Sequence, residues 1–88
     1  MGIILVVDDE TAYLKVYESI FRRYLPEHRV ITTDSPLEAI RIAGIERLDT
    51  IIMDINMPEM DGFEACRVLK SRDRTRFVPV ILITGDHL

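Results

Sequence analysis

The stretch IILVV at residues 3–7 runs directly into Asp8 and Asp9, and the stretch TIIM at residues 50–53 runs directly into Asp54. A run that is apolar at every position is typical of a strand buried on both faces, as in a parallel sheet. The carboxyl ends of neighbouring parallel strands lie at the same edge of the sheet, so we expect the three carboxylates to converge in one crevice. Like charges packed that closely repel each other and favour a compensating cation, and hard oxygen ligands suit Mg²⁺. The two stretches therefore predict an acidic, metal-binding pocket at the edge of a small α/β sheet.

Strand and helix patterns alternate along the rest of the chain. We expect two further strands, at residues 29–32 and 77–84. We expect three helices: one from near residue 10 to Pro26, one from a cap at Asp34 or Ser35, and one over residues 63–71. The order βαβαβαβ predicts an α/β fold, in which a parallel sheet with right-handed crossovers carries helices on both faces.

Apolar residues at helical spacing predict which side of each helix meets the sheet. In the first helix they are Tyr13, Val16, Tyr17, Ile20, Phe21 and Tyr24, in the second Leu37, Ile40 and Ile45, and in the third Ala65, Cys66, Val68 and Leu69. Ser35, Pro36 and Glu38 form a helix start signal, with a hydroxyl cap, a proline at the first helical position and an acid three residues after the cap. The Asp61-Gly62 pair predicts a turn and a helix cap rather than a chemical role.

The composition of the chain limits its function class. The chain has 88 residues and a net charge of −4, which suits one soluble domain and argues against direct nucleic-acid binding. The basic run at residues 70–76 predicts a solvated loop, with a docking patch for an acidic partner as the alternative. Cys66 is the only cysteine, so no intrachain disulfide can form, and we expect a cytoplasmic setting. No apolar stretch is long enough to span a membrane, and no signal peptide is expected.

The residues at the predicted strand ends suggest phosphoryl chemistry. Asp54 is the candidate nucleophile, because a carboxylate can attack a phosphoryl group to form an aspartyl phosphate. Asp8 and Asp9 would hold Mg²⁺, the Asn56 backbone carbonyl could complete the ligands, and the Thr84 hydroxyl could contact a phosphoryl oxygen. Each residue also has an ordinary interpretation. Asp8 and Asp9 could equally cap the first helix, Asp54 could be a solvated loop acid, and Thr84 could simply end a strand.

Three motifs together resemble the receiver domain of two-component response regulators. They are VVDDE at residues 6–10, MDINMPEMDG at residues 53–62 and PVILITG at residues 79–85. The resemblance runs from end to end of the chain, in order and with the spacing of the family. It implies a flavodoxin-like, doubly wound parallel sheet with strand order 2-1-3-4.

The resemblance also implies roles for individual residues. Asp54 would be the phosphorylated aspartate, and Thr84 would be the switch hydroxyl that moves toward the phosphoryl group. Mg²⁺ would be bound by Asp9, Asp54 and the Asn56 carbonyl, with Asp8 in support. The donor would be a phosphohistidine on a histidine kinase or a histidine phosphotransfer protein.

The chain departs from the family pattern at its end. Receiver domains usually continue with a fourth helix, a fifth strand that ends in a lysine, and a fifth helix, whereas this sequence stops at Leu88. We therefore expect residues 1–88 to be the N-terminal two-thirds of a receiver domain. Lys15 and Lys70, the only lysines, fall on the first and third predicted helices, so neither takes the place of that lysine. The fourth strand becomes a sheet edge, and we expect the 88-residue form to self-associate through it.

Three function classes compete on these observations. The first is a phosphoacceptor signalling module, which is not a turnover enzyme although it could dephosphorylate itself slowly. The second is an interaction module that is never phosphorylated and assembles through the exposed fourth strand. The third, a hydrolase with an aspartate nucleophile, is disfavoured, because such enzymes need a second acid two residues after the nucleophile, where this chain has Asn56.

Overall fold

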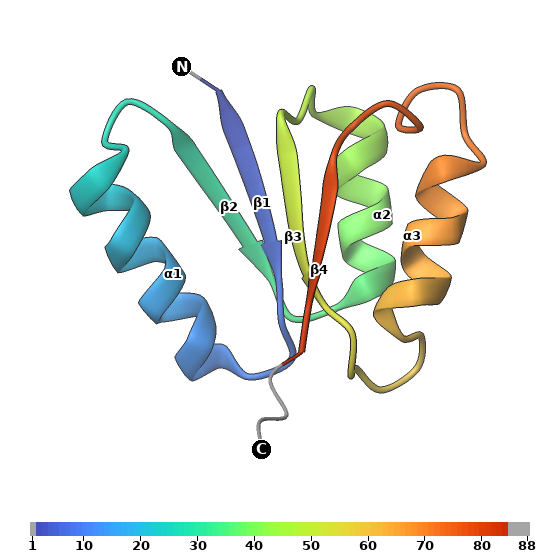
Figure 1. Cartoon of the computed structure of the whole chain (residues 1–88), viewed down its shortest axis with the longest axis horizontal. Coiled ribbons are helices and arrows are strands. Elements are labelled where there is room, and N and C mark those ends of the chain that lie inside the picture. The colour runs from blue at the N-terminus through green and yellow to red at the C-terminus, as the bar shows by residue number, and fades with distance from the viewer. Residues whose placement is uncertain (1, 85–88) are drawn as a thin grey trace.

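Four parallel strands form one sheet in the order β2-β1-β3-β4, flanked by helices on both faces (Figure 1). The structure is a computed structural model, and it describes residues 2–84. The strands are β1 (Ile3–Val7), β2 (Arg29–Thr33), β3 (Thr50–Asp54) and β4 (Val80–Ile83). The helices are α1 (Thr11–Tyr24), α2 (Pro36–Ile45) and α3 (Gly62–Lys70). The predicted α/β class and the strand order 2-1-3-4 are confirmed.

Alternate residues of β1 enter two separate parts of the core. Leu5 and Val7 pack in the cluster that α2 and α3 cover, whereas Ile4 and Val6 pack against α1. Successive side chains of a strand point to opposite faces, so a strand covered on both sides must be apolar throughout. The unbroken apolar run at residues 3–7 therefore has a direct structural cause.

The predicted apolar face of α1 is only partly correct. Leu14, which lies outside the predicted stripe, is the buried residue of the helix, and Tyr17 and Phe21 pack beside it. The rest of the stripe is exposed, by 46% at Tyr13, 53% at Val16, 46% at Ile20 and 69% at Tyr24. The stripe is wider than the surface that the helix covers, because α1 lies along β1 and β2, so only the flank that carries Leu14, Tyr17 and Phe21 meets the sheet.

The second helix is buried through small side chains. Its buried residues are Pro36, Ala39, Ile40 and Ala43, whereas Leu37 and Ile45 are exposed. The prediction was therefore right for Ile40 and wrong for the other two residues, because the small side chains of Ala39 and Ala43 form the rest of the buried face. In α3 the prediction holds for Ala65 and Leu69, which are buried, while Val68 packs against the core and Cys66 is half-buried.

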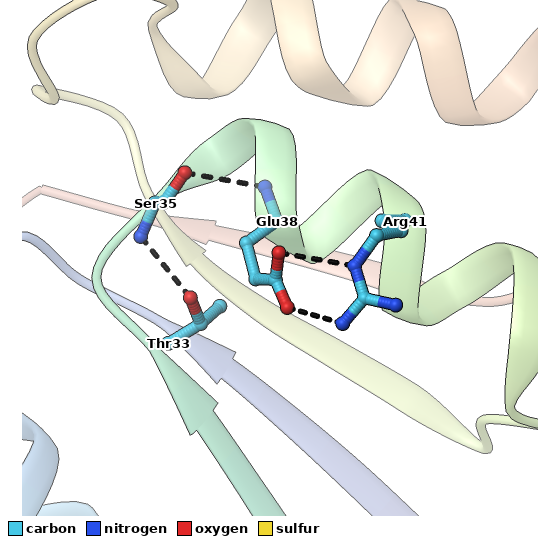
Figure 2. A network of polar contacts seen from close by, with 4 residues as sticks. All are labelled: Thr33, Ser35, Glu38 and Arg41. Carbon is cyan, nitrogen blue, oxygen red and sulfur yellow. Dashed lines mark hydrogen bonds and ion pairs between the residues drawn. The ribbon is translucent and has the colours of Figure 1, made fainter.

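Local hydrogen bonds fix the starts of α2 and α3. The cap of α2 is Ser35, whose Oγ accepts from the Glu38 N–H at 3.2 Å, and the Ser35 N–H donates to Thr33 Oγ1 at 3.2 Å (Figure 2). The Glu38 carboxylate in turn accepts hydrogen bonds from Nε and Nη2 of Arg41, one turn further along the helix. The start of α3 is a capping box with Asp61 as its cap, which confirms the capping role expected for that residue.

The fourth strand is shorter than predicted. It begins at Val80, and residues 71–79 form a loop in which Phe77 is 82% exposed. Within residues 2–84, β4 pairs with β3 alone, so its other side is an edge of the sheet. No helix among the described residues is long and apolar enough to cross a membrane.

Replacing Ser35 with alanine tests the cap of α2. The change removes the acceptor for the Glu38 N–H, so we expect Ser35→Ala to lower the unfolding free energy by about 1 kcal/mol. Chemical denaturation followed by circular dichroism measures it. Ser19→Ala, at an exposed position in α1, is the control and should leave stability unchanged or slightly raised. Equal losses in both variants would contradict the assignment of the cap.

Candidate metal centre at the edge of the sheet

The register of the sheet brings the predicted acidic residues together. Val7 pairs with Met53, so Asp8 and Asp54 are the next residues on two adjacent strands. Each of Asp8, Asp9 and Asp54 offers a carboxylate oxygen, and these atoms lie within 4.8 Å of one another. Asp8 and Asp54 are 2% and 5% exposed, whereas Asp9 faces solvent. The site therefore combines two buried acids with one accessible acid.

Backbone hydrogen bonds orient the two buried carboxylates. Asp8 Oδ1 accepts from the Glu10 N–H at 2.9 Å, and Asp54 Oδ1 accepts from the Asn56 N–H at 3.3 Å. The cap position of α1 is Glu10, which makes no side-chain capping bond. Neither Asp8 nor Asp9 caps α1, so the capping interpretation of the acidic pair is wrong.

The electrostatics of the pocket are dominated by negative charge. Burial raises the pKa of Asp8 above its usual range, and the nearby charges of Asp54, Asp9 and Glu10 raise it further, although the hydrogen bond from the Glu10 N–H opposes the shift. Burial also raises the pKa of Tyr17, and the charges of Asp8 and Asp54 add to the effect. Three oxygen ligands in an environment that penalises their charge fit a hard divalent cation such as Mg²⁺.

A tight loop between β3 and α3 holds Asn56 beside Asp54. The Gly62 N–H donates to the Ile55 carbonyl at 2.8 Å, which closes the loop on the end of β3. A Cβ at Gly62 would lie 2.6 Å from the Asp54 carbonyl oxygen and 2.9 Å from Ile55 Cα, so only glycine fits there. Glu59 has a φ of 71°, a left-handed conformation that costs a non-glycine residue about 1 kcal/mol. The sequence identified the turn at Asp61-Gly62 but not this close contact.

A groove leads from the acidic cluster along α1. It has a volume of about 350 Å³ and is lined by Asp8, Tyr13, Val16, Tyr17, Ile20, Ile83 and Thr84. Thr84 directly follows β4 and lines the same groove as Asp8. Gly85, the last residue of the third motif, lies outside the described residues.

Comparisons with known proteins all point to one family. Residues 4–87 match the response regulator receiver domain. The response regulator PleD of Caulobacter vibrioides is 41% identical over 84 residues, which cover 93% of this chain and 18% of PleD. The polar-differentiation response regulator DivK of Brucella anthropi is 33% identical over 82 residues, which cover 93% of this chain and 65% of DivK. The chain thus spans less than two-thirds of the length of these relatives.

Solved structures agree with the sequence relatives. The receiver domain of a sensor histidine kinase from Pseudomonas aeruginosa PAO1, which has a magnesium ion coordinated in its active site cleft, superposes with a TM-score of 0.88 at 32% identity. That match covers 99% of this chain and 70% of the other. The N-terminal domain of a response regulator receiver protein from Methanoculleus marisnigri JR1 superposes with a TM-score of 0.90 at 32% identity, covering 100% of this chain and 70% of the other.

Adding a methyl group at Gly62 tests the close contact beneath the site. We expect Gly62→Ala to lower the unfolding free energy by about 2 kcal/mol, because the new Cβ would press on the backbone of β3. Gly44→Ala is the matched control, since nothing lies within 4 Å of its Cβ position. Because alanine favours a helix over glycine, we expect this variant to raise the unfolding free energy by roughly 0.5–1 kcal/mol. Thermal unfolding measures the stability of both variants. Changes in stability of the same sign and size in the two variants would argue against the contact.

Neutralising Asp8 tests the repulsion within the cluster. An asparagine at this position would keep the acceptor for the Glu10 N–H and remove the charge, so Asp8→Asn should raise the unfolding temperature in chelator, by roughly 4–8 °C for each kcal/mol of repulsion relieved. Because the folded protein raises the pKa of Asp8, the ionised parent loses stability as pH rises through that pKa. The gain should therefore be small in acid and grow toward neutral pH.

Magnesium and a distant acid provide the controls for this measurement. At neutral pH, Mg²⁺ should stabilise the parent more than the Asp8→Asn variant, so the difference between their unfolding temperatures should become smaller. Asp34→Asn, at an exposed position outside the cluster, is the control. It should not raise the unfolding temperature in a pH-dependent way, and Mg²⁺ should stabilise it as much as the parent. A gain at Asp8 that does not depend on pH would contradict the repulsion.

Proposed function

Since the chain belongs to the receiver domain family of response regulators, we propose that it is the phosphoacceptor of a two-component phosphorelay. The observation that carries the proposal is the convergence of the Asp8, Asp9 and Asp54 carboxylates within 4.8 Å at the carboxyl edge of the sheet. A phosphoryl group transferred to one of these residues would lie beside a cation held by the others. That residues 1–88 form the N-terminal two-thirds of a receiver domain stays a prediction.

The proposed transfer uses Asp54 as the nucleophile. One Asp54 carboxylate oxygen attacks the phosphorus of a phosphohistidine, the new O–P bond forms as the N–P bond breaks, and the donor imidazole leaves with the electron pair of that bond. The carboxylates of Asp8, Asp9 and Asp54 and the Asn56 carbonyl would hold Mg²⁺. When bound, the ion offsets the negative charge of the phosphoryl oxygens. Thr84 would donate its hydroxyl hydrogen to one of those oxygens.

The donor and the product follow from this chemistry. We propose a histidine kinase or a histidine phosphotransfer protein in the cytoplasm as the donor. The solved receiver domain from Pseudomonas aeruginosa is itself part of a sensor histidine kinase. Asn56 supplies no acid–base group for rapid hydrolysis, so the aspartyl phosphate would be lost only slowly and the domain would not act as a turnover enzyme.

The lysines of this chain are placed away from the phosphoryl chemistry. Lys70 is in the last turn of α3, where its Nζ donates to the carbonyls of Arg76 and Val78 at the opposite end of the sheet. Lys15 is exposed on α1. Neither lysine therefore contributes to the proposed stabilisation of the phosphoryl group.

A second candidate function is an interaction module that assembles through β4. It is favoured by exposed apolar side chains on two elements: Tyr13, Val16 and Ile20, which line the groove on α1, and Ile81, 51% exposed, on β4. Within the described residues, β4 also has one unpaired edge. Strand pairing at this edge, together with burial of the apolar side chains, would produce self-association of the 88-residue form.

Loss of the nucleophile tests the phosphoacceptor proposal. Incubation with acetyl phosphate and Mg²⁺ should add one phosphoryl group to the parent, and intact-mass spectrometry should find none on Asp54→Asn, because an amide oxygen is a far weaker nucleophile than a carboxylate. Asp73→Asn, at a fully exposed loop position, is the control and should be labelled like the parent. Labelling of Asp54→Asn at the parental rate would refute the proposal.

Beryllofluoride separates the two candidate functions. A phosphoacceptor should bind it with Mg²⁺ and show spectral changes at Asp54, Asn56 and Thr84 in an NMR titration. An interaction module without phosphoryl chemistry should show no such change, and light scattering should report a molar mass that rises with concentration. A monomer at all concentrations would exclude assembly through β4.

A further inference from the structure

The loop between α3 and β4, residues 71–79, forms a basic end of the molecule. The segment 67–79 contains one acid, Asp73, and five basic residues: Arg67, Lys70, Arg72, Arg74 and Arg76. The whole chain has a net charge of −4, so positive charge is strongly concentrated here. Figure 1 shows this loop at the end of the sheet opposite the carboxyl ends of the strands, where the acidic cluster lies. The loop therefore forms a surface separate from the proposed phosphoryl site.

Internal hydrogen bonds give the loop a defined shape. Thr75 is 2% exposed, and its hydroxyl donates to the Leu69 carbonyl at 2.6 Å. Lys70 Nζ donates to the carbonyls of Arg76 and Val78 at 3.1 and 2.6 Å. Arg74 Nη2 donates to the carbonyl of Ile45, at the end of α2, at 3.1 Å. Because these bonds already order the backbone, a partner would not have to order the loop on binding.

The tip of the loop presents an aromatic side chain with a cation above it. Phe77 is 82% exposed, and the Arg76 guanidinium lies 4.8 Å from the centre of its ring. A single exposed apolar residue is ordinary on a protein surface. Phenylalanine and arginine, however, are among the residue types enriched at protein interfaces.

A groove beside the loop combines an apolar floor with basic walls. It has a volume of about 310 Å³ and is lined by Glu46, Arg47, Leu48, Arg74 and Val78. Val78 is half-buried and offers apolar contact surface, and the buried Leu48 lies at the base of the groove. The two arginines offer positive charge. The negative charge of Glu46 is partly offset by an ion pair, because its Oε1 lies 3.8 Å from Nη1 of Arg29. The groove can accept one aliphatic side chain from a segment that is otherwise acidic.

We propose that this loop and groove form a docking surface for an acidic peptide segment of a partner protein. Acidic side chains of the partner would pair with Arg47, Arg72 and Arg76, and an apolar side chain would enter the groove over Leu48 and Val78. A peptide fits better than a nucleic acid, because only a peptide can place an aliphatic side chain in the groove next to its acidic groups. The surface is distinct from the phosphoacceptor site and does not depend on its chemistry.

Fluorescence anisotropy with a defined probe tests this proposal. The probe is a short fluorescein-labelled peptide of glutamates with one central leucine, used at low ionic strength with the full chain. We expect the double variant Arg76→Gln/Phe77→Ser to weaken probe binding by about tenfold or more, because it removes a cation and an aromatic anchor. Both side chains are mainly exposed, so folding should be unaffected, and circular dichroism verifies this point.

A second cation–aromatic pair provides the matched control. Arg23 lies 5.7 Å from the ring centre of Tyr24, which is 69% exposed at the end of α1. Arg23→Gln/Tyr24→Ser makes the same change in charge and also removes an exposed aromatic ring, yet it should alter probe binding by less than about twofold. Phosphorylation at Asp54 should be unchanged in both double variants.

Three results would overturn the proposal. The first is that the unaltered chain does not bind the probe. The second is an equal loss of binding in the two double variants, which would indicate attraction to net charge alone. The third is tighter binding of a single-stranded oligonucleotide than of the peptide, which would identify a nucleic-acid surface instead.

Discussion

The parallel pairing of β1 with β3 is the constraint on which the site depends. Val7 lies opposite Met53, so Asp8 and Asp54 leave the sheet side by side. A slip of one residue would turn every side chain of a strand to the other face. Both faces of β1 and β3 are covered, and Leu5 and Met53 are fully buried, so the core opposes any such slip. The packing that stabilises the domain therefore also brings the carboxylates together.

The features that could be predicted from sequence have local causes. An apolar run between charged residues indicates a buried strand, and an acid directly after each of two such runs indicates a shared edge. The caps at Ser35 and Asp61 follow from hydrogen bonds to residues three positions away. The α/β class and the acidic cluster were therefore accessible from local patterns alone, whereas the strand order followed from the resemblance to receiver domains.

The features that could not be predicted depend on which surfaces meet. The apolar stripe of α1 does not say which flank is covered, and Leu14 is buried although it lies outside the stripe. Large side chains seemed the natural inner face of α2, yet Leu37 and Ile45 are exposed, and Ala39 and Ala43 are buried beside Ile40. No local pattern distinguishes the buried Asp8 from the exposed Asp9, and none indicates the left-handed backbone of Glu59.

The contact between Gly62 and the backbone of Asp54 has a mechanical consequence. The first residue of α3 lies directly against the last residue of β3, with no room even for a methyl group between them. Close-packed interiors transmit displacement rather than absorb it. A small shift of the strand end would therefore displace the first turn of α3 as well. Any movement of the Asp54 backbone would in this way be passed on to the helix.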